Sequence, residues 1–98
     1  MLLTIGIFVE EDDNFVGSIA TLTFQHKAAI VPAADPDFNE PTHWVYANGV
    51  KIGQARKDRN AKHGCHLSVK LDDPSFKRPF SCKLLNEGHG HHRLVWNR

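Results

Sequence analysis

The sequence is short of the features that mark several protein classes. Its 98 residues include 12 lysines and arginines against 11 acids, so the formal net charge is only +1. A chain this close to neutral is neither a polyanionic mimic of DNA nor a generally basic coat for nucleic acid. Any binding of phosphate groups would therefore depend on a local basic patch.

Long apolar runs are also missing. The N-terminal stretch MLLTIGIFVEEDD has no basic leader, and its short apolar segment is followed at once by acids. We therefore expect neither a signal peptide nor a membrane span, and we predict a cytoplasmic protein. Thiols stay reduced in the cytoplasm, so the two cysteines, Cys65 and Cys82, are expected to be free core or strand residues.

No window has the apolar spacing of three and four residues that predicts an amphipathic helix. Hydrophobic residues, 41% of the chain, come instead in short runs separated by turn residues, as is typical of all-β proteins. We predict one domain over residues 1–98, a small antiparallel β-barrel or sandwich of about six or seven short strands. The segments expected to carry the strands are 3–9, 15–25, 27–32, 42–55, 65–71, 79–85 and 93–97. A bulge is expected near Ala20–Thr21, and loops at 33–41, 56–64 and 86–92.

The clearest local signal is the hairpin THWVYANGVKIGQA at 42–55, where Asn48-Gly49 favours a type I′ turn. That turn predicts the opposed pairs Ala47–Val50, Tyr46–Lys51, Val45–Ile52 and Trp44–Gly53. Alternation then directs Val45, Ala47, Val50 and Ile52 to the core, and Trp44, Tyr46 and Lys51 to the other face.

The stretch LSVKLDDPSF at 67–76 contains two adjacent acids, Asp72 and Asp73. Leu67, Val69 and Leu71 alternate as core residues, and the next strand repeats the pattern with Phe80, Cys82 and Leu84. Asp-Pro at 73–74 fits the first two positions of a type I turn, with Phe76 folding back onto the core. A structural turn explains this stretch better than acid–base catalysis, although it gives Asp72 no role.

Several segments together resemble the domain-of-unknown-function 736 family (DUF736) of small bacterial proteins. They are TIGIF (4–8), GSIATLTF (17–24), KAAIVP (27–32), VYANGVKIGQA (45–55), LSVKLDDPSF (67–76) and LVWNR (94–98). The chain departs from the family pattern at Arg56, where a tryptophan is usual, at His66, where an aromatic is usual, and at GHGHH, where an acidic turn is usual. The resemblance implies a gene on a plasmid or other mobile element, near replication and transfer genes. It supplies no catalytic residues.

Histidines are numerous, and three of them, His89, His91 and His92, form an H-x-H-H motif in a glycine-flanked loop. Imidazoles suit zinc, copper or nickel, but no carboxylate or second cysteine completes a known ligand spacing. Cys65 lies next to His66 and near His63, yet adjacency in sequence does not make a catalytic dyad. A metal site at the three histidines is thus an alternative to ordinary surface histidines, and we expect no cofactor.

A basic loop follows the aromatic hairpin. Its candidate binding residues are Trp44, Tyr46, Lys51, Arg56, Lys57 and Arg59. Aromatic platforms beside a cationic groove are how small barrels hold single-stranded nucleic acid. In the alternative interpretation the sheet buries Trp44, and the basic residues only make a loop soluble.

These observations predict a non-enzymatic binding module. Its preferred partner is a protein of the transfer, replication or host-defence machinery of a mobile element. Single-stranded nucleic acid and a metal ion remain the two alternative ligands. The sequence does not determine the oligomeric state.

Overall fold

The computed structural model describes residues 2–22, 25–35, 37, 40–57, 65–74, 76 and 78–97, and of residues 2, 65, 66 and 97 only the backbone. These residues form eight strands: β1 (Leu2–Glu11), β2 (Asn14–Ala20), β3 (Gln25–Pro32), β4 (His43–Ala47), β5 (Val50–Lys57), β6 (Cys65–Leu71), β7 (Phe80–Gly88) and β8 (His91–Asn97). The predicted all-β class is confirmed. The described part of the chain contains no helix long and apolar enough to cross a membrane.

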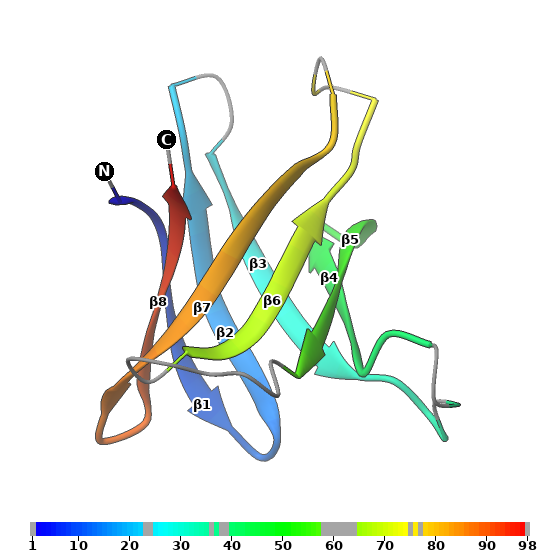
Figure 1. The fold of residues 1–98 in the computed structure, drawn as a ribbon, viewed down its shortest axis with the longest axis vertical. Coiled ribbons are helices and arrows are strands. Elements are labelled where there is room, and N and C mark those ends of the chain that lie inside the picture. The colour runs from blue at the N-terminus through cyan, green and yellow to red at the C-terminus, as the bar shows by residue number, and fades with distance from the viewer. Residues whose placement is uncertain are drawn as a thin grey trace.

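The strands close into a ring. Each strand pairs antiparallel with the next along the chain, and β1 also pairs with β8, from Leu2–Asn97 to Val9–His91 (Figure 1). Of the two predicted architectures, the barrel is therefore the observed one. Closure leaves no open sheet edge among β1–β8, so a partner has to meet side chains or loops rather than add a strand.

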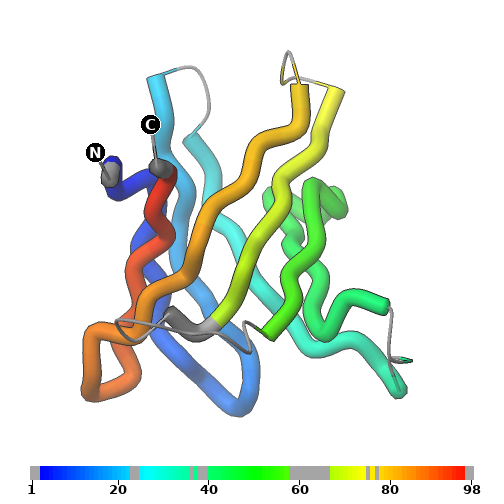
Figure 2. Tube along the Cα trace, in the orientation of Figure 1, coloured from blue at the N-terminus to red at the C-terminus, as the bar shows by residue number. Residues whose placement is uncertain are grey.

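The connections lie at two ends of the barrel (Figure 2). One end carries both chain termini and the β2–β3 and β6–β7 connections, and the other carries the β1–β2, β3–β4 and β7–β8 connections. The acidic turn between β1 and β2 consists of Asp12 and Asp13, both with positive φ, a conformation that aspartate tolerates better than most residues.

Strand alternation fills the barrel interior. The predicted inward residues Leu67, Val69 and Leu71 are all buried, as are Cys82 and Leu84. The other buried hydrophobic residues that join this core are Ile5, Phe8, Phe15, Ile19, Ala28, Ile30, Val45, Ala47, Ile52, Ala55 and Leu94. Together the two groups of buried residues come from all of β1–β8, so the core depends on the ring being closed.

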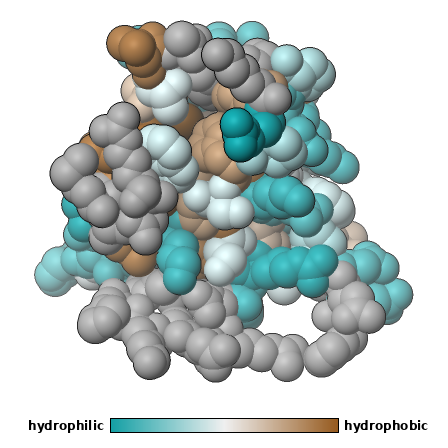
Figure 3. All heavy atoms as spheres, turned by 45° about the horizontal axis from the view of Figure 1, so that its top comes forward, coloured by the Kyte–Doolittle hydropathy of each residue, from teal (hydrophilic) through white to brown (hydrophobic). Residues whose placement is uncertain are grey.

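Aromatic side chains cover the end of the core near the termini. Phe76 and Phe80 pack edge to face with centroids 5.1 Å apart, and Trp96 follows at 6.4 Å from Phe80. With this end brought forward, hydrophobic side chains are visible between hydrophilic ones (Figure 3). The amide N–H of Phe76 donates to the carbonyl of Asp73 at 2.8 Å, which confirms both the predicted turn and the inward return of Phe76.

The β4–β5 hairpin was predicted in part. Ala47–Val50 and Tyr46–Lys51 are paired as expected, but a bulge then sets Val45 opposite Gly53 and Trp44 opposite Gln54. The inward placement of Val50 is also wrong, since this residue is 54% exposed. The reason is that β6 pairs with β5 only from Gly53 onward, so at Val50 the strand has a paired neighbour, β4, on one side only.

Other irregularities also differ from the sequence prediction. β2 ends at Ala20, so no bulge occurs at Ala20–Thr21, whereas register shifts occur in β1 between Thr4 and Gly6 and in the β6–β7 and β7–β8 pairs. The turn expected over 86–92 contracts to His89–Gly90 because β7 and β8 extend further. Of the loop expected at 56–64, the first two residues belong to β5 and the rest lie outside the described residues.

Gly17 is required for the approach of β1 to β2. A Cβ atom at this position would lie 1.8 Å from the carbonyl oxygen of Ile7, so even alanine would force the two backbones apart. We expect Gly17→Ala to lower the free energy of unfolding by about 1–3 kcal/mol. Ser18→Ala, at the exposed neighbouring position, is expected to change it by less than about 0.5 kcal/mol. Urea denaturation followed by circular dichroism measures both, and equal midpoints would contradict the close-approach argument.

Candidate functional site

Of the predicted binding residues that the structure describes, all but Lys57 lie on the outer surface of the barrel, and Lys57 lies opposite the buried Leu67 at the end of β5. Trp44 and Tyr46 are half-buried on β4, and Lys51, Arg56 and Lys57 are exposed on β5. Arg59 lies outside the described residues. The structure therefore places the aromatic pair and the nearby lysine on one side of the sheet, as the hairpin predicted.

Cross-strand pairing determines which outer side chains are neighbours. Trp44 lies opposite Gln54, Gln54 opposite Lys70, and Lys70 opposite Ser81, so one row crosses β4, β5, β6 and β7. Directly opposed side chains on a sheet have Cβ atoms about 4.5–5.5 Å apart. The row therefore brings Lys70 of β6 toward the aromatic residue of β4.

Lys51 covers the indole ring of Trp44. Its Nζ atom lies 4.1 Å from the ring centroid, within the range of a cation–π contact. Lys51 is paired with Tyr46, two residues along β4 from Trp44, and the bulge sets Trp44 opposite Gln54, so the lysine reaches back along the hairpin to the ring. The contact orients a cation and an aromatic face toward the same volume of solvent.

A pocket of about 250 Å³ opens beside this contact. It is lined by Trp44, Lys51, Gly53, Gln54, Lys70 and Asp72. Gly53 lets β5 and β6 approach closely at the pocket, since a Cβ atom there would lie 2.3 Å from the backbone oxygen of Lys70. The walls thus combine an aromatic ring, two ammonium groups, one amide and one carboxylate.

Four of these lining residues were missed as site residues from sequence: Gly53, Gln54, Lys70 and Asp72. Lys70 points outward because it alternates with the buried Val69 and Leu71, but only the pairing of β5 with β6 brings it next to Gln54. Asp72 follows the end of β6, and its amide N–H donates to the carbonyl of Ile52 at 2.7 Å, which holds it against the bulged part of β5. No pattern within a single segment could have joined Trp44 to Asp72.

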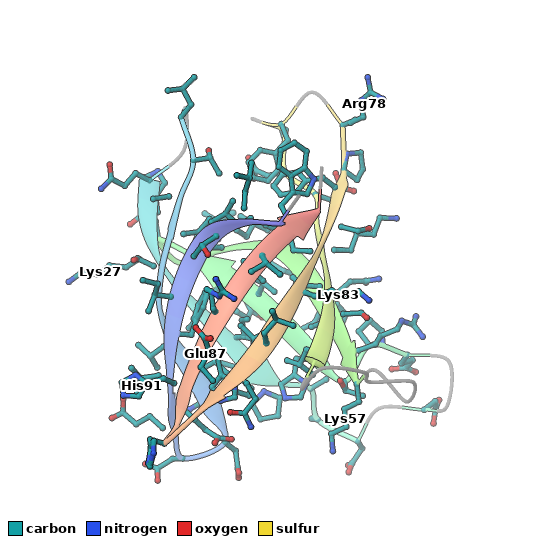
Figure 4. All side chains as sticks on the ribbon, turned by 60° about the vertical axis from the view of Figure 1, so that its left-hand side comes forward. Lys27, Lys57, Arg78, Lys83, Glu87 and His91 are labelled. Atoms are coloured by element: carbon teal, nitrogen blue, oxygen red, sulfur yellow. The ribbon has the colours of Figure 1, made fainter. Side chains whose placement is uncertain are left out.

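Charge is unevenly distributed over the surface. The charged side chains described on β5 and β6 are all cations: Lys51, Arg56, Lys57 and Lys70. Lys83 on β7 continues this side of the barrel, and Figure 4 shows it projecting away from Lys27 of β3. Most of the exposed acids described lie instead at the end of β1, in the β1–β2 turn and in the β3–β4 loop: Glu10, Glu11, Asp12, Asp13, Asp35, Asp37 and Glu40. The other two are Asp72, after β6, and Glu87, on β7. A chain of net charge +1 therefore still has a distinctly basic face.

The three histidines proposed as metal ligands do not point together. His92 is only 2% exposed, with its ring edge-on to Phe15 at 4.7 Å and its Nε2 4.0 Å from Oε2 of Glu10. His91 is exposed on the opposite face of β8, and Figure 4 shows it pointing outward. His89 occupies the turn with positive φ. Among the described residues no group of three His, Cys, Asp or Glu side chains is arranged to hold a metal ion; His63 and the side chain of His66 lie outside them.

Cys82 is buried in the core at 4% exposure. Burial raises the pKa of its thiol from 9.0 to about 12, so the thiol stays protonated at neutral pH. The thiolate is the reactive form of cysteine, and Cys82 is therefore a packing residue. The side chain of Cys65 and the whole of His63 lie outside the described residues.

The burial of Cys82 has a measurable consequence. In a Cys65→Ser variant, which leaves Cys82 as the single thiol, we expect almost no alkylation by iodoacetamide at neutral pH while the protein is folded. Concentrated guanidinium chloride should expose the thiol, restore its ordinary pKa and allow complete reaction. Mass spectrometry measures the modified fraction, and equal labelling rates in the two conditions would contradict the buried placement.

Comparison with known proteins complements this geometry. No curated protein and no solved structure matches the chain. A family model described as "Protein of unknown function (DUF736)" matches residues 4–98, which include nearly all of β1 and the whole of β2–β8. The match confirms the resemblance seen in the TIGIF, VYANGVKIGQA and LSVKLDDPSF segments. The chain belongs to the DUF736 family.

Proposed function

We propose that this protein is a non-enzymatic binding module whose basic face on β4–β7 holds single-stranded nucleic acid. The observation that carries the proposal is the Lys51–Trp44 contact at the edge of a pocket that also contains Lys70. An aromatic face and two cations in one small volume match the two chemical parts of a nucleotide, its base and its phosphate.

A single strand fits this face better than a duplex. A base has to leave its helical stack before it can lie on Trp44, where it would take the place of the Lys51 ammonium over the ring. The bases of single strands are free to do so. The cations of β5 and β6 flank the pocket along the sheet, so phosphates on either side of the stacked base would meet Lys51, Lys70 or Arg56. The polar groups of the pocket are suited to recognition by charge and hydrogen bonding.

The setting we propose is a bacterial cytoplasm and a mobile genetic element. This part rests on the family resemblance, which implies genes near replication and transfer functions. Both processes expose single-stranded nucleic acid, so the proposed ligand is consistent with that setting.

Binding of a fluorescent oligothymidine, measured by anisotropy, tests this function. We expect affinity at low salt that falls steeply as salt rises. Trp44→Ala should weaken binding by roughly 5-fold to 150-fold, the loss of one stacked base. Lys51→Ala and Lys70→Ala should each reduce the slope of log K against log salt by about 0.7.

Lys27→Ala is the matched control, because it removes the same charge from an exposed lysine that projects elsewhere on the barrel (Figure 4). It is expected to leave the oligonucleotide affinity within about two-fold of that of the unchanged protein. The proposal fails if no binding occurs at low salt, or if Lys27→Ala weakens binding as much as Lys51→Ala and Lys70→Ala do. Thermal unfolding of each variant separates lost binding from lost structure.

A second candidate function, binding of a protein partner, is favoured by a different surface. Ile7, Val9 and Val16 are 63%, 45% and 44% exposed on the outside of β1 and β2, and Val9 lies directly opposite Val16. An apolar cluster on the outside of a sheet is typical of a contact surface. β1 is four strands away from β5 around the ring, so this surface is separate from the basic face. We propose that it contacts a protein of the transfer, replication or host-defence machinery.

This second function predicts that binding of the protein partner depends on the apolar surface alone. Tagged protein expressed in its native host should co-purify with a defined protein, and Val16→Glu should abolish the association because a charge then replaces an apolar contact. Trp44→Ala should leave it intact. A capture that survives Val16→Glu, or that Trp44→Ala also abolishes, would contradict a role for β1–β2.

A further inference from the structure

We infer that Asp72 makes the pocket selective for guanine among the bases of a single strand. The inference rests on the proposed binding of nucleic acid and names the part of the ligand that the site distinguishes. It concerns the one acidic group among the pocket-lining residues.

Asp72 is held in place by the fold and lies beside the stacking surface. Its amide N–H is bonded to Ile52 at 2.7 Å, while its side chain is exposed and lines the same pocket as Trp44. The next residue, Asp73, provides the carbonyl that closes the turn to Phe76. Among the described residues no ion pair joins Asp72 to Lys51 or Lys70. The carboxylate is thus available to a ligand.

A carboxylate on this face opposes phosphate binding, because it lowers the positive potential that the lysines create. It contributes favourably only where the ligand presents hydrogen-bond donors, since an ionised carboxylate is an acceptor with two oxygens. A base lying on Trp44 would direct an edge toward the other lining residues, Gln54 and Asp72.

Guanine is the base whose edge matches this pair. Its N1–H and N2 amino group are adjacent donors that a carboxylate accepts together, and its O6 atom can accept from the amide of Gln54. Cytosine and adenine each offer an amino group next to an acceptor nitrogen, which faces a carboxylate unfavourably. Thymine offers one N–H between two carbonyl oxygens. Guanine therefore gains the most from Asp72, and thymine gains the least.

The test compares three fluorescent oligonucleotides: oligothymidine, the same strand with one central guanine, and the same strand with inosine, which lacks the N2 amino group. With the unchanged protein we expect the guanine strand to bind roughly 5-fold to 150-fold more tightly than oligothymidine, as for one bidentate contact. The inosine strand should fall between them. Asp72→Asn should reduce the guanine preference to within about two-fold and strengthen binding of oligothymidine, because a negative charge is removed.

Asp12→Asn is the matched control. It removes one negative charge at the β1–β2 turn, and asparagine tolerates the positive φ of that position. It should leave the guanine preference unchanged. Equal binding of all three strands, or a preference that survives Asp72→Asn, would overturn the assignment of Asp72 while leaving the proposed function in place. Failure of every strand to bind at low salt would overturn both.

Discussion

The antiparallel pairing of β1 with β8 is the contact on which the rest of the structure depends. It joins the two ends of the chain, with residues 2–9 against 91–97, and turns an eight-stranded sheet of described residues into a ring. Because the ring has no edge, its backbone hydrogen bonds are satisfied internally and its inner side chains form one core. A chain of 98 residues thereby obtains a rigid support whose outer surface is left to side-chain chemistry.

Local departures from regular pairing shape that outer surface. The bulge in the β4–β5 hairpin sets Trp44 opposite Gln54, and the missing side chain of Gly53 lets the backbone of β6 approach. Together they shape the pocket. Lys70 of β6 contributes a positive charge to it, and Asp72, just after β6, contributes a negative one. A regular hairpin would have paired Trp44 with Gly53, and the aromatic ring would have met different neighbours. Bulges near binding sites commonly redirect a side chain in this way.

Several parts of the fold could be predicted because their causes are local. Alternation identified Leu67, Val69 and Leu71 as core, Asn48-Gly49 predicted the hairpin turn, and Asp-Pro predicted the turn that returns Phe76 to the core. The exposure of Val50 was not predictable in this way, since it depends on where the neighbouring strand β6 stops pairing. The same holds for His91 and His92, because the start of β8 decides that one faces solvent and the other the core.

The sequence by itself determined the all-β class, most of the inward residues and the outward placement of Trp44, Tyr46 and Lys51. These features follow from side-chain alternation and turn chemistry, which act over a few residues. Only the tertiary structure decided the closed ring, the register shift and the meeting of Trp44 with Lys70 and Asp72. Those features depend on pairing between strands that are distant along the chain, and such pairing is selected by the packing of the whole core.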